Sequence, residues 1–341
     1  MFSEINLERV TQGMRPISME CLFIFNDFKA SAIEQLKQNV APIHAEINDS
    51  IESLFIDVDY HSKAFNELYP EIKTRIQALR FGNVLFNLDQ GGYKDVDDNI
   101  IADIMNTWKS AEVFLTFMIK ALLTYLSPDQ EKNRSLLNNP ELISKIYQML
   151  ESNDNVMSKN EFLGNAEKIV FDNFKRFAPI VSPFSIHNPD GWQYWLIHFA
   201  NSYRARQVYN DVLHENSTMQ AHFGRSGLRM LSYDPSHEGN LYLFDESSRT
   251  KAKNELHDDI PRMISDHGDA LDVMSFYNAS YNETAAHSDD IHEMIIENPD
   301  VEVITQSGGE RRVPNTIRPD DILRLRDQKS FFPMFIKGKI R

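Results

Sequence analysis

Short apolar runs that alternate with helix-like stretches constrain the fold of this 341-residue chain most strongly. Four such runs occur in its first third, at Cys21–Phe25, Ser53–Val58, Val84–Leu88 and Ala111–Phe117. Each is followed by a segment with helix-like character. Largely apolar strands that alternate with helices are typical of a parallel sheet covered on both faces. The pattern therefore predicts an α/β fold built on a Rossmann-like sheet.

A turn signal further along the chain predicts how this sheet ends. Two more apolar runs, Ala178–Ile186 and Gln193–Ala200, flank an Asn-Pro-Asp-Gly turn and are expected to form an antiparallel hairpin. A hairpin after strand–helix repeats is typical of a class I methyltransferase-type sheet. Residues 127–177 contain no strand-like run and are expected to form a helical insertion. The predicted α/β domain covers residues 1–220.

Acidic side chains stand at the carboxyl ends of three predicted strands. Asp27, Asp59 and Asp89 follow or close the first three apolar runs. Because open α/β sheets bind ligands beyond the carboxyl ends of their strands, these residues predict a nucleotide-like cofactor site. Asp27 would bind ribose hydroxyls, Asp59 would lie at the adenine, and Asp89 would face the reactive centre. Asp also commonly caps the helix that follows a strand, and this alternative stays open for each residue.

One element of a methyltransferase sheet is missing from the sequence. Such a sheet is led by a strand that ends in a glycine-rich turn, where backbone N–H groups approach the cofactor. Before Cys21 only Gly13 occurs. The missing strand would be the central one, so the strands at Cys21–Phe25 and Val84–Leu88 would share no neighbour. A polypeptide that begins late, a strand supplied by a partner and a rearranged sheet all remain open.

The last third of the chain predicts a linker and then a winged-helix domain. Residues 221–256 are polar and rich in turn signals, and residues 257–341 begin with three helix-like segments. Val301–Pro314 then forms a predicted hairpin around Ser-Gly-Gly. Arg311 and Arg312 lie in this predicted wing, where a basic side chain contacts phosphate or the minor groove. The helix before the wing is acidic, which opposes docking on DNA, so a protein contact is the alternative.

Charge is distributed unevenly over the chain. The net charge of −15 argues against a protein that simply coats nucleic acid. Residues 303–341 nevertheless carry nine Lys/Arg against four Asp/Glu, whereas residues 251–302 carry three against thirteen. A basic end on an acidic body indicates either a nucleic-acid contact or internal pairing. Arg204 and Arg206, near the start of the helix after the hairpin, are further candidates for a phosphate contact or a solvated face.

Cysteine content and hydropathy bound the cellular setting. The single cysteine, Cys21, excludes an intrachain disulfide and a cysteine-based zinc cluster. No apolar run reaches the roughly 18 residues that cross a bilayer, and the first residues lack the apolar core of a secretory signal. A cytoplasmic protein without a membrane contact is expected. His198 lies within a predicted strand and is expected to be a core histidine rather than a ligand.

Five sequence blocks taken together resemble the three-Cys-motif partner (TcmP) family. They are LFNLDQGGYKDV, AEVFLTFMIKALLTYL, YWLIHFANSYRARQVYNDVLHE, HFGRSGLRMLSYDP and GGERRVPNTIRPDDIL. The resemblance runs from about Arg15 to Phe332. It implies a class I methyltransferase-like fold with a C-terminal winged helix. It also implies a partner, a radical-SAM-like protein with a three-cysteine motif.

The resemblance also assigns site residues. The family's Asp-Pro-Phe-Gly-like block falls on Asp89, Gln90, Gly91 and Gly92, with Gln90 in the place of the proline, whereas its leading glycine-rich block has no counterpart. S-adenosylmethionine is the implied cofactor. Its implied binding residues are Asp27, Asp59, Gly91 and Gly92, with Asp89 and Tyr93 on the catalytic side.

Two hypotheses follow from the sequence. In the first, the chain is a SAM-dependent methyltransferase-like protein that acts on nucleic acid beside its radical-SAM-like partner, and Asp89 orients a base amine or accepts its proton. In the second, the chain is a catalytically inactive methyltransferase fold that binds protein or nucleic acid as an adaptor. The missing glycine turn and Gln90 favour the second hypothesis.

Overall fold

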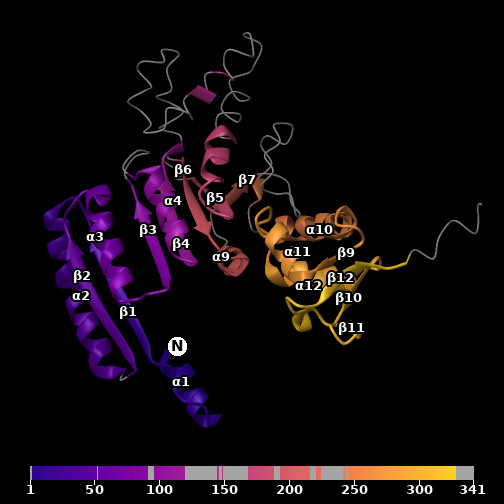
Figure 1. Cartoon of the computed structure of the whole chain (residues 1–341), viewed down its shortest axis with the longest axis horizontal. Helices are drawn as coiled ribbons and strands as arrows, with labels where there is room; N and C mark the ends of the chain where they lie inside the picture. The colour runs from indigo at the N-terminus through magenta and orange to yellow at the C-terminus, as the bar shows by residue number, and fades with distance from the viewer. Residues whose placement is uncertain are drawn as a thin grey trace, which may run out of the picture. The chain divides into compact units, whose positions relative to one another are not determined.

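The computed structural model describes most of the chain, namely residues 2–51, 53–90, 96–119, 144–145, 148, 168–187, 193–215, 220–223, 241–242 and 245–327. The chain divides into two compact units, Met1–Arg80 and Phe81–Arg341 (Figure 1). The strands of the described residues form three sheets, of two, four and six strands. The protein is therefore of mixed α/β class, as the alternating pattern predicts.

The first unit is built on a parallel pair of strands joined by a helix. Its elements are α1 (Phe2–Thr11), β1 (Met19–Asn26), α2 (Ala30–Ser50), β2 (Leu54–His61) and α3 (Phe65–Ala78). β1 and β2 pair in one continuous parallel register, and α2 provides the crossover that parallel strands require. Both predicted strands are present, and β2 continues past Val58 to His61.

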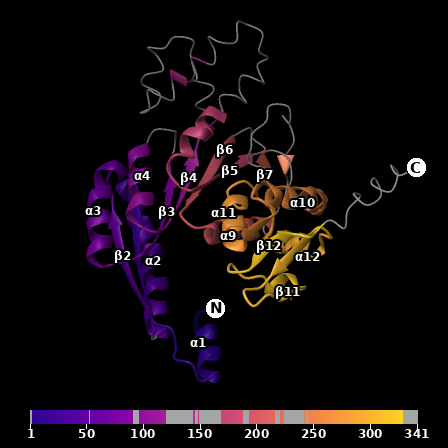
Figure 2. The ribbon, with the colours of Figure 1, turned by 45° about the vertical axis from the view of Figure 1, so that its right-hand side comes forward.

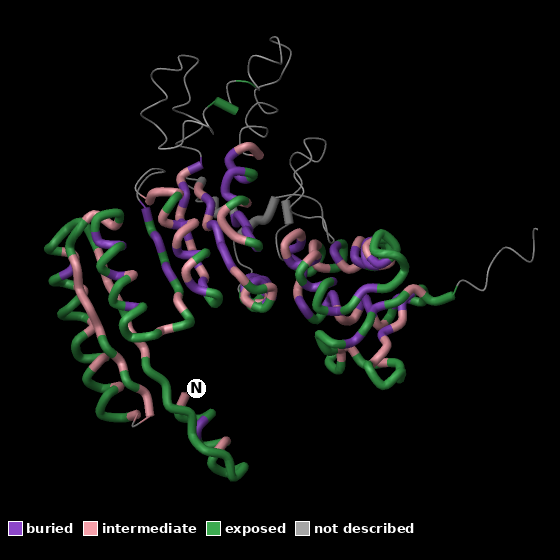
Figure 3. The backbone as a smooth tube through the Cα atoms, in the orientation of Figure 1, coloured by how far each residue is buried: buried purple, intermediate pink, exposed green. Residues whose placement is uncertain are grey.

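Burial in the first unit is concentrated on its helices. No side chain of β1 or β2 is fully buried, and Phe23 and Phe55 are 47% and 55% exposed. Figure 3 shows both strands in the colours of half-buried and exposed residues. The buried apolar side chains of this unit are Ile33, Leu68, Tyr69, Ile72 and Ile76, all on α2 or α3. Neither face of this parallel pair is therefore fully buried.

The second unit begins with the six-stranded sheet. Its elements up to β8 are β3 (Asn83–Asp89), α4 (Asp98–Thr107), β4 (Ser110–Phe117), β5 (Ile180–His187), β6 (Gln193–Ala200), α9 (Tyr203–Glu215), β7 (Gln220–Phe223) and β8 (Leu241–Tyr242). The strand order is β3-β4-β6-β5-β7-β8. β3 and β4 are parallel, and β5 and β6 form an antiparallel pair. The predicted hairpin is confirmed, and β7 and β8 continue the sheet beyond it.

One face of this sheet carries a dense apolar core. Along β4, alternate residues are fully buried while their neighbours are half-buried, which is the period of a strand with one packed face. The aromatic rings of Phe117 and Phe174 meet edge to face at 5.1 Å, and Phe174 also contacts Phe199 at 5.9 Å. Phe174 belongs to a helical segment at residues 168–174. This core distinguishes the second sheet from the β1–β2 pair.

The C-terminal subdomain, residues 245–327, belongs to the same unit. Its elements are α10 (Glu246–Asp266), β9 (Ala270–Asp272), α11 (Val273–Ser280), α12 (Ser288–Glu297), β10 (Val301–Ile304), β11 (Glu310–Arg311), the 3-10 turn η2 (Pro314–Thr316) and β12 (Ile322–Leu325). Its four strands are ordered β11-β10-β12-β9, all antiparallel. The β10–β11 turn uses Gly308 at a φ of 83°, as the Ser-Gly-Gly signal predicts.

Three further expectations meet the structure only in part. α10 begins at Glu246, so the last part of the predicted linker is helical, and β7 and β8 lie within or at the start of the same stretch. Most of the predicted insertion at residues 127–177 lies outside the described residues. β1 and β3 belong to different sheets, and no strand among the described residues pairs with both. The expectation that these two strands share no neighbour therefore agrees with the pairing of the described strands.

Candidate functional site

Asp27 stands at the end of β1, where the sequence predicts a ribose-binding carboxylate. Its Oδ1 accepts a hydrogen bond of 2.7 Å from the amide of Lys29, the residue directly before α2. Its own amide donates to the carbonyl oxygen of His61 at 3.3 Å. One oxygen of the carboxylate thus stabilises the turn before α2 without capping the helix, since Lys29 is the N-cap residue and has no side-chain capping hydrogen bond.

Asp59 lies inside β2 rather than at its end. Asp57 and Asp59 are two residues apart in the strand and so point to the same face. Arg75 of α3 reaches both carboxylates, with 2.7 Å between its Nη2 and Oδ2 of Asp57 and a closer ion pair to Asp59. A ligand that used Asp59 for adenine would compete with this guanidinium.

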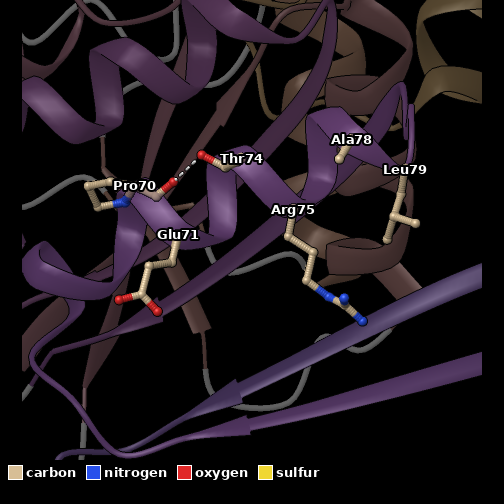
Figure 4. A pocket seen from close by; sticks show the side chains of 6 residues that line it. All are labelled: Pro70, Glu71, Thr74, Arg75, Ala78 and Leu79. Atoms are coloured by element: carbon tan, nitrogen blue, oxygen red, sulfur yellow. Dashed lines mark hydrogen bonds between the residues drawn. The ribbon is translucent and has the colours of Figure 1, made fainter.

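A shallow hollow runs along α3 beside the same arginine. Its lining residues all belong to α3 or to the residue that follows it: Pro70, Glu71, Thr74, Arg75, Ala78 and Leu79. Figure 4 shows the Thr74 hydroxyl donating to the Pro70 carbonyl oxygen, at 2.9 Å. Glu71 accepts from Lys63 at 2.7 Å. Since the polar side chains of this hollow are already engaged, it lacks the convergent polar groups of a small-molecule site.

Asp89 is the last residue of β3 and is exposed. Its register partner on β4 is Thr116, and its carboxylate forms no hydrogen bond or ion pair within the described residues. The next residue, Gln90, is buried, and its Oε1 accepts from the Val96 amide at 3.2 Å. Gln90 therefore links the end of β3 to Val96, two residues before α4. Gly91, Gly92 and Tyr93 lie outside the described residues.

The three predicted carboxylates are divided between the two units. Asp27 and Asp59 belong to the first unit, on adjacent strands, and Asp89 belongs to the second. The described residues contain no group of three or more His, Cys, Asp or Glu side chains that could hold a metal ion. Of the three carboxylates, Asp27 and Asp59 therefore belong to the two-stranded sheet region, and Asp89 belongs to the six-stranded sheet.

Arg206 requires a correction, because it is fully buried and cannot face a nucleic acid. Arg206, Asn210 and His214 follow one another at four-residue spacing on one face of α9. The Thr284 carbonyl oxygen accepts hydrogen bonds from Arg206 Nη2 at 3.2 Å and from Asn210 Nδ2 at 3.1 Å. His214 Nε2 lies 3.1 Å from the Ala285 carbonyl oxygen. This polar face fastens α9 to the C-terminal subdomain (Figure 2).

Burial shapes the chemistry of the residues beneath α9. Desolvation lowers the pKa of Arg206 to about 10, and its guanidinium lies over the Tyr209 ring at 5.4 Å. His198 stacks on Phe114 at 4.7 Å, and its Nε2 lies 3.0 Å from a carboxylate oxygen of Glu112. Desolvation also lowers the pKa of His198, so this ring is a neutral core group. The expectation of a core histidine is confirmed.

The remaining arginines that the sequence predicts to contact nucleic acid differ in whether their guanidinium groups face solvent. Arg311 donates two hydrogen bonds, of 3.0 and 3.1 Å, to the buried carboxylate of Asp321. Arg312 is 83% exposed, with one nitrogen 3.6 Å from Glu310. Arg204 is exposed as well, and it donates to Gln207 at 2.6 Å. Arg312 and Arg204 thus keep solvent-facing cations, whereas Arg311 acts within the fold.

Acidic residues of α12 are paired internally. Asp290 is buried and accepts hydrogen bonds of 2.6 and 2.8 Å from Arg249 of α10. Lys253 donates to Glu293 at 2.6 Å. At the start of α12, Asp211 of α9 accepts from the Ser288 amide at 2.9 Å and from its hydroxyl at 2.8 Å. Arg324 and Arg326 of the basic stretch form ion pairs with Glu302 of the acidic stretch, so part of the charge asymmetry is internal pairing.

Comparison of the chain with protein-family models, curated proteins and solved structures finds no match. Among the described residues, no helix is long and apolar enough to span a bilayer. Sequence reasoning missed three arrangements: the Arg75 pair with Asp57 and Asp59, the Glu112–His198 contact, and the polar face of α9. The four-residue spacing of Arg206, Asn210 and His214 was the one signal in the sequence for the last of these.

Proposed function

We propose that this chain is a methyltransferase-fold adaptor, a non-enzymatic module that binds a partner polypeptide through an incomplete sheet. The observation that carries the proposal is that β1 and β3 each have one strand partner among the described residues, β2 and β4 respectively. In a methyltransferase sheet the strand whose glycine-rich turn meets the cofactor would pair with strands such as these. A sheet without it lacks the main-chain donors for the cofactor.

The strand order supports a methyltransferase-type fold for this adaptor. β2 and β1 are parallel, β3 and β4 are parallel, and the antiparallel β6 and β5 follow β4. Each of these two partial orders, taken by itself, supports a class I methyltransferase-type sheet. In the C-terminal subdomain, the succession α10-β9-α11-α12-β10-β12, with β12 between β10 and β9, supports a winged helix.

Electrostatics favours a protein over a nucleic acid as the partner of this winged helix. α12 corresponds to the helix that would enter a major groove, and it carries the exposed carboxylates Asp289 and Glu297 with no Lys or Arg. Phosphate repulsion opposes such docking. The proposed partner is a protein such as the radical-SAM-like, three-cysteine-motif protein that the sequence resemblance implies.

Calorimetric titration with S-adenosylmethionine and S-adenosylhomocysteine tests the adaptor proposal. We expect no saturable heat from the folded 341-residue chain. Saturable binding to the wild type, lost in both Asp27→Ala and Asp89→Ala, would overturn the proposal. Arg262→Ala on the exposed surface of α10 is the matched control, because Arg262 is 67% exposed and far along the chain from all three carboxylates.

A SAM-dependent methyltransferase that acts on nucleic acid is the second candidate, and Asp89 favours it. An exposed carboxylate at a strand end, with no partner in the described residues, suits a group that orients a base amine or accepts its proton. Arg312 and Arg204 would supply phosphate contacts. This candidate predicts that each Arg→Ala variant weakens binding to a labelled oligonucleotide and reduces its salt dependence. Salt-independent or absent binding would exclude it.

A further inference from the structure

β3 is an edge strand with one neighbour. It pairs only with β4 among the described strands, in a continuous register from Asn83 opposite Ser110 to Asp89 opposite Thr116. In a parallel pair, alternate residues direct their N–H and C=O groups to the opposite side of the strand. Within the described residues no backbone group outside β4 bonds to β3. Half of its main-chain polar groups therefore face an open edge.

This edge lacks the devices that keep isolated edges apart. Natural edge strands carry Lys, Pro or a bulge, which prevents pairing with another chain. The sequence of β3, NVLFNLD, contains no Lys, Arg or Pro, and its register with β4 shows no bulge. A seven-residue edge strand with no Lys, Arg, Pro or bulge is a template for strand addition.

The side chains of β3 indicate what kind of segment the edge accepts. Phe86 and Leu88 are buried on the packed face, whereas Leu85 on the other face is 65% exposed. An added strand would place a side chain beside Leu85 and cover it, so an apolar residue there is favoured. Each chain carries a net charge of −15, which disfavours a second copy as the source of that strand.

β1 in the first unit shows the same features independently. Its sequence, MECLFIFN, contains no Lys, Arg or Pro, and β2 is its one partner among the described strands. Met19 and Phe23 are 41% and 47% exposed. A two-stranded sheet is marginally stable alone in water. Edge strands in both units therefore lack Lys, Arg and Pro and expose apolar side chains. Because the feature occurs twice, we do not treat the exposed edge of β3 as a chance feature of one strand.

We propose that the open edge of β3 docks an extended, apolar and uncharged or basic segment of a partner polypeptide, which adds a strand to the six-stranded sheet. The inference rests on the proposed adaptor function and gives its mode of recognition. In β-strand addition, main-chain hydrogen bonds supply affinity and alternate side chains supply specificity. The contact would centre on Leu85, while the buried side chains of Phe86 and Leu88 fix β3 in place on the packed face of the sheet.

A synthetic peptide added to the 341-residue chain tests this proposal. The probe is a fluorescent peptide with the β4 sequence, SAEVFLTF, flanked by lysines, because β4 is a strand that β3 already pairs with. A second peptide carries prolines in place of the adjacent valine and phenylalanine, which removes one main-chain donor on each side. Binding is measured by fluorescence anisotropy, and the mass of the chain alone is measured by light scattering.

The expected result is saturable binding of the first peptide, about tenfold weaker binding of the proline peptide, and about tenfold weaker binding to Leu85→Lys. Val208→Lys, at a 50% exposed position of α9, is the matched control and should bind like the wild type. Equal binding of both peptides, or none, would overturn the proposal. A dimer of the chain alone that Leu85→Lys dissociates would also overturn it, by assigning the edge to a second copy. Failure here leaves the cofactor titration of the adaptor proposal unaffected.

Discussion

The two parallel strand pairs of this chain, β1–β2 and β3–β4, arise from the same kind of apolar run but differ in burial. β4 has a second neighbour, β6, and buries Ala111, Val113, Leu115 and Phe117 on one face. β1 and β2 have only each other among the described strands, and none of their side chains is fully buried. An apolar run predicts a strand, whereas burial depends on what completes the sheet around it.

The largest expected effect comes from comparing a phenylalanine of the six-stranded sheet with a phenylalanine of the β1–β2 pair. Phe199→Ala removes a fully buried ring of β6 and should cost about 3–5 kcal/mol of unfolding free energy. Phe23→Ala, at a 47% exposed ring of β1, should cost less than about 1 kcal/mol. Urea unfolding of both variants measures the difference. Equal losses would mean that β1 is already packed in the isolated chain.

A comparison of ion pairs should show the next largest difference. Asp290 is buried against Arg249 and Lys253, so Asp290→Ala should cost about 3 kcal/mol by leaving cations without their partner. Asp57 is 66% exposed beside Arg75, and Asp57→Ala should cost less than about 1 kcal/mol. Chemical denaturation checks both values. A large loss for Asp57→Ala would contradict the open character of the first unit.

Acid should weaken the second unit through its buried histidines. Burial lowers the pKa of His214 from 6.5 to about 4, so the unfolded chain takes up a proton more readily than the folded one. The stabilisation is complete above pH 6.5 and is lost as the pH falls towards 4. His214→Gln keeps a donor for the Ala285 carbonyl oxygen and should reduce this loss by about 1–3 kcal/mol. An unchanged stability profile between pH 7 and 4.5 would contradict this role.

The smallest expected effect is at the β3 edge itself. Leu85→Lys should change the unfolding free energy by less than about 0.5 kcal/mol, because the side chain is 65% exposed. Phe86→Lys, one residue on and buried, should prevent normal folding or cost several kcal/mol, on the order of 3–5. Thermal unfolding of the two variants measures how much each face of β3 contributes to stability. A severe loss from Leu85→Lys would mean that this face is already covered.

Sequence patterns predicted the strands well because apolar runs and turn residues act locally. The runs at Cys21–Phe25 and Val84–Leu88 and the Asn-Pro-Asp-Gly hairpin are examples. Such patterns could not predict which face of α9 is buried. Val208 and Val212 are about half exposed, whereas Arg206 and Asn210 are buried. That inversion depends on backbone carbonyl groups more than 70 residues away along the chain. The four-residue spacing of Arg206, Asn210 and His214 shows that they share a face, but not that this face is buried.

The candidate site was only partly accessible to sequence reasoning for a related reason. Strand ends placed Asp27 and Asp89 correctly at the ends of β1 and β3. The pattern could not reveal that Arg75, on the following helix, engages Asp59. Nor could spacing alone distinguish Arg312, which faces solvent, from Arg311, which Asp321 holds. In both cases the partner is set by tertiary packing.

Hydrogen exchange of the isolated chain, resolved along β1, β3 and β6, tests the central claim most directly. Since β6 pairs on both sides and β1 and β3 on one, we predict slow exchange throughout β6 and fast exchange at alternate amides of β1 and β3. Protection of every β1 and β3 amide to the level of β6, in a monomer without ligand, would contradict the claim that both edges are open.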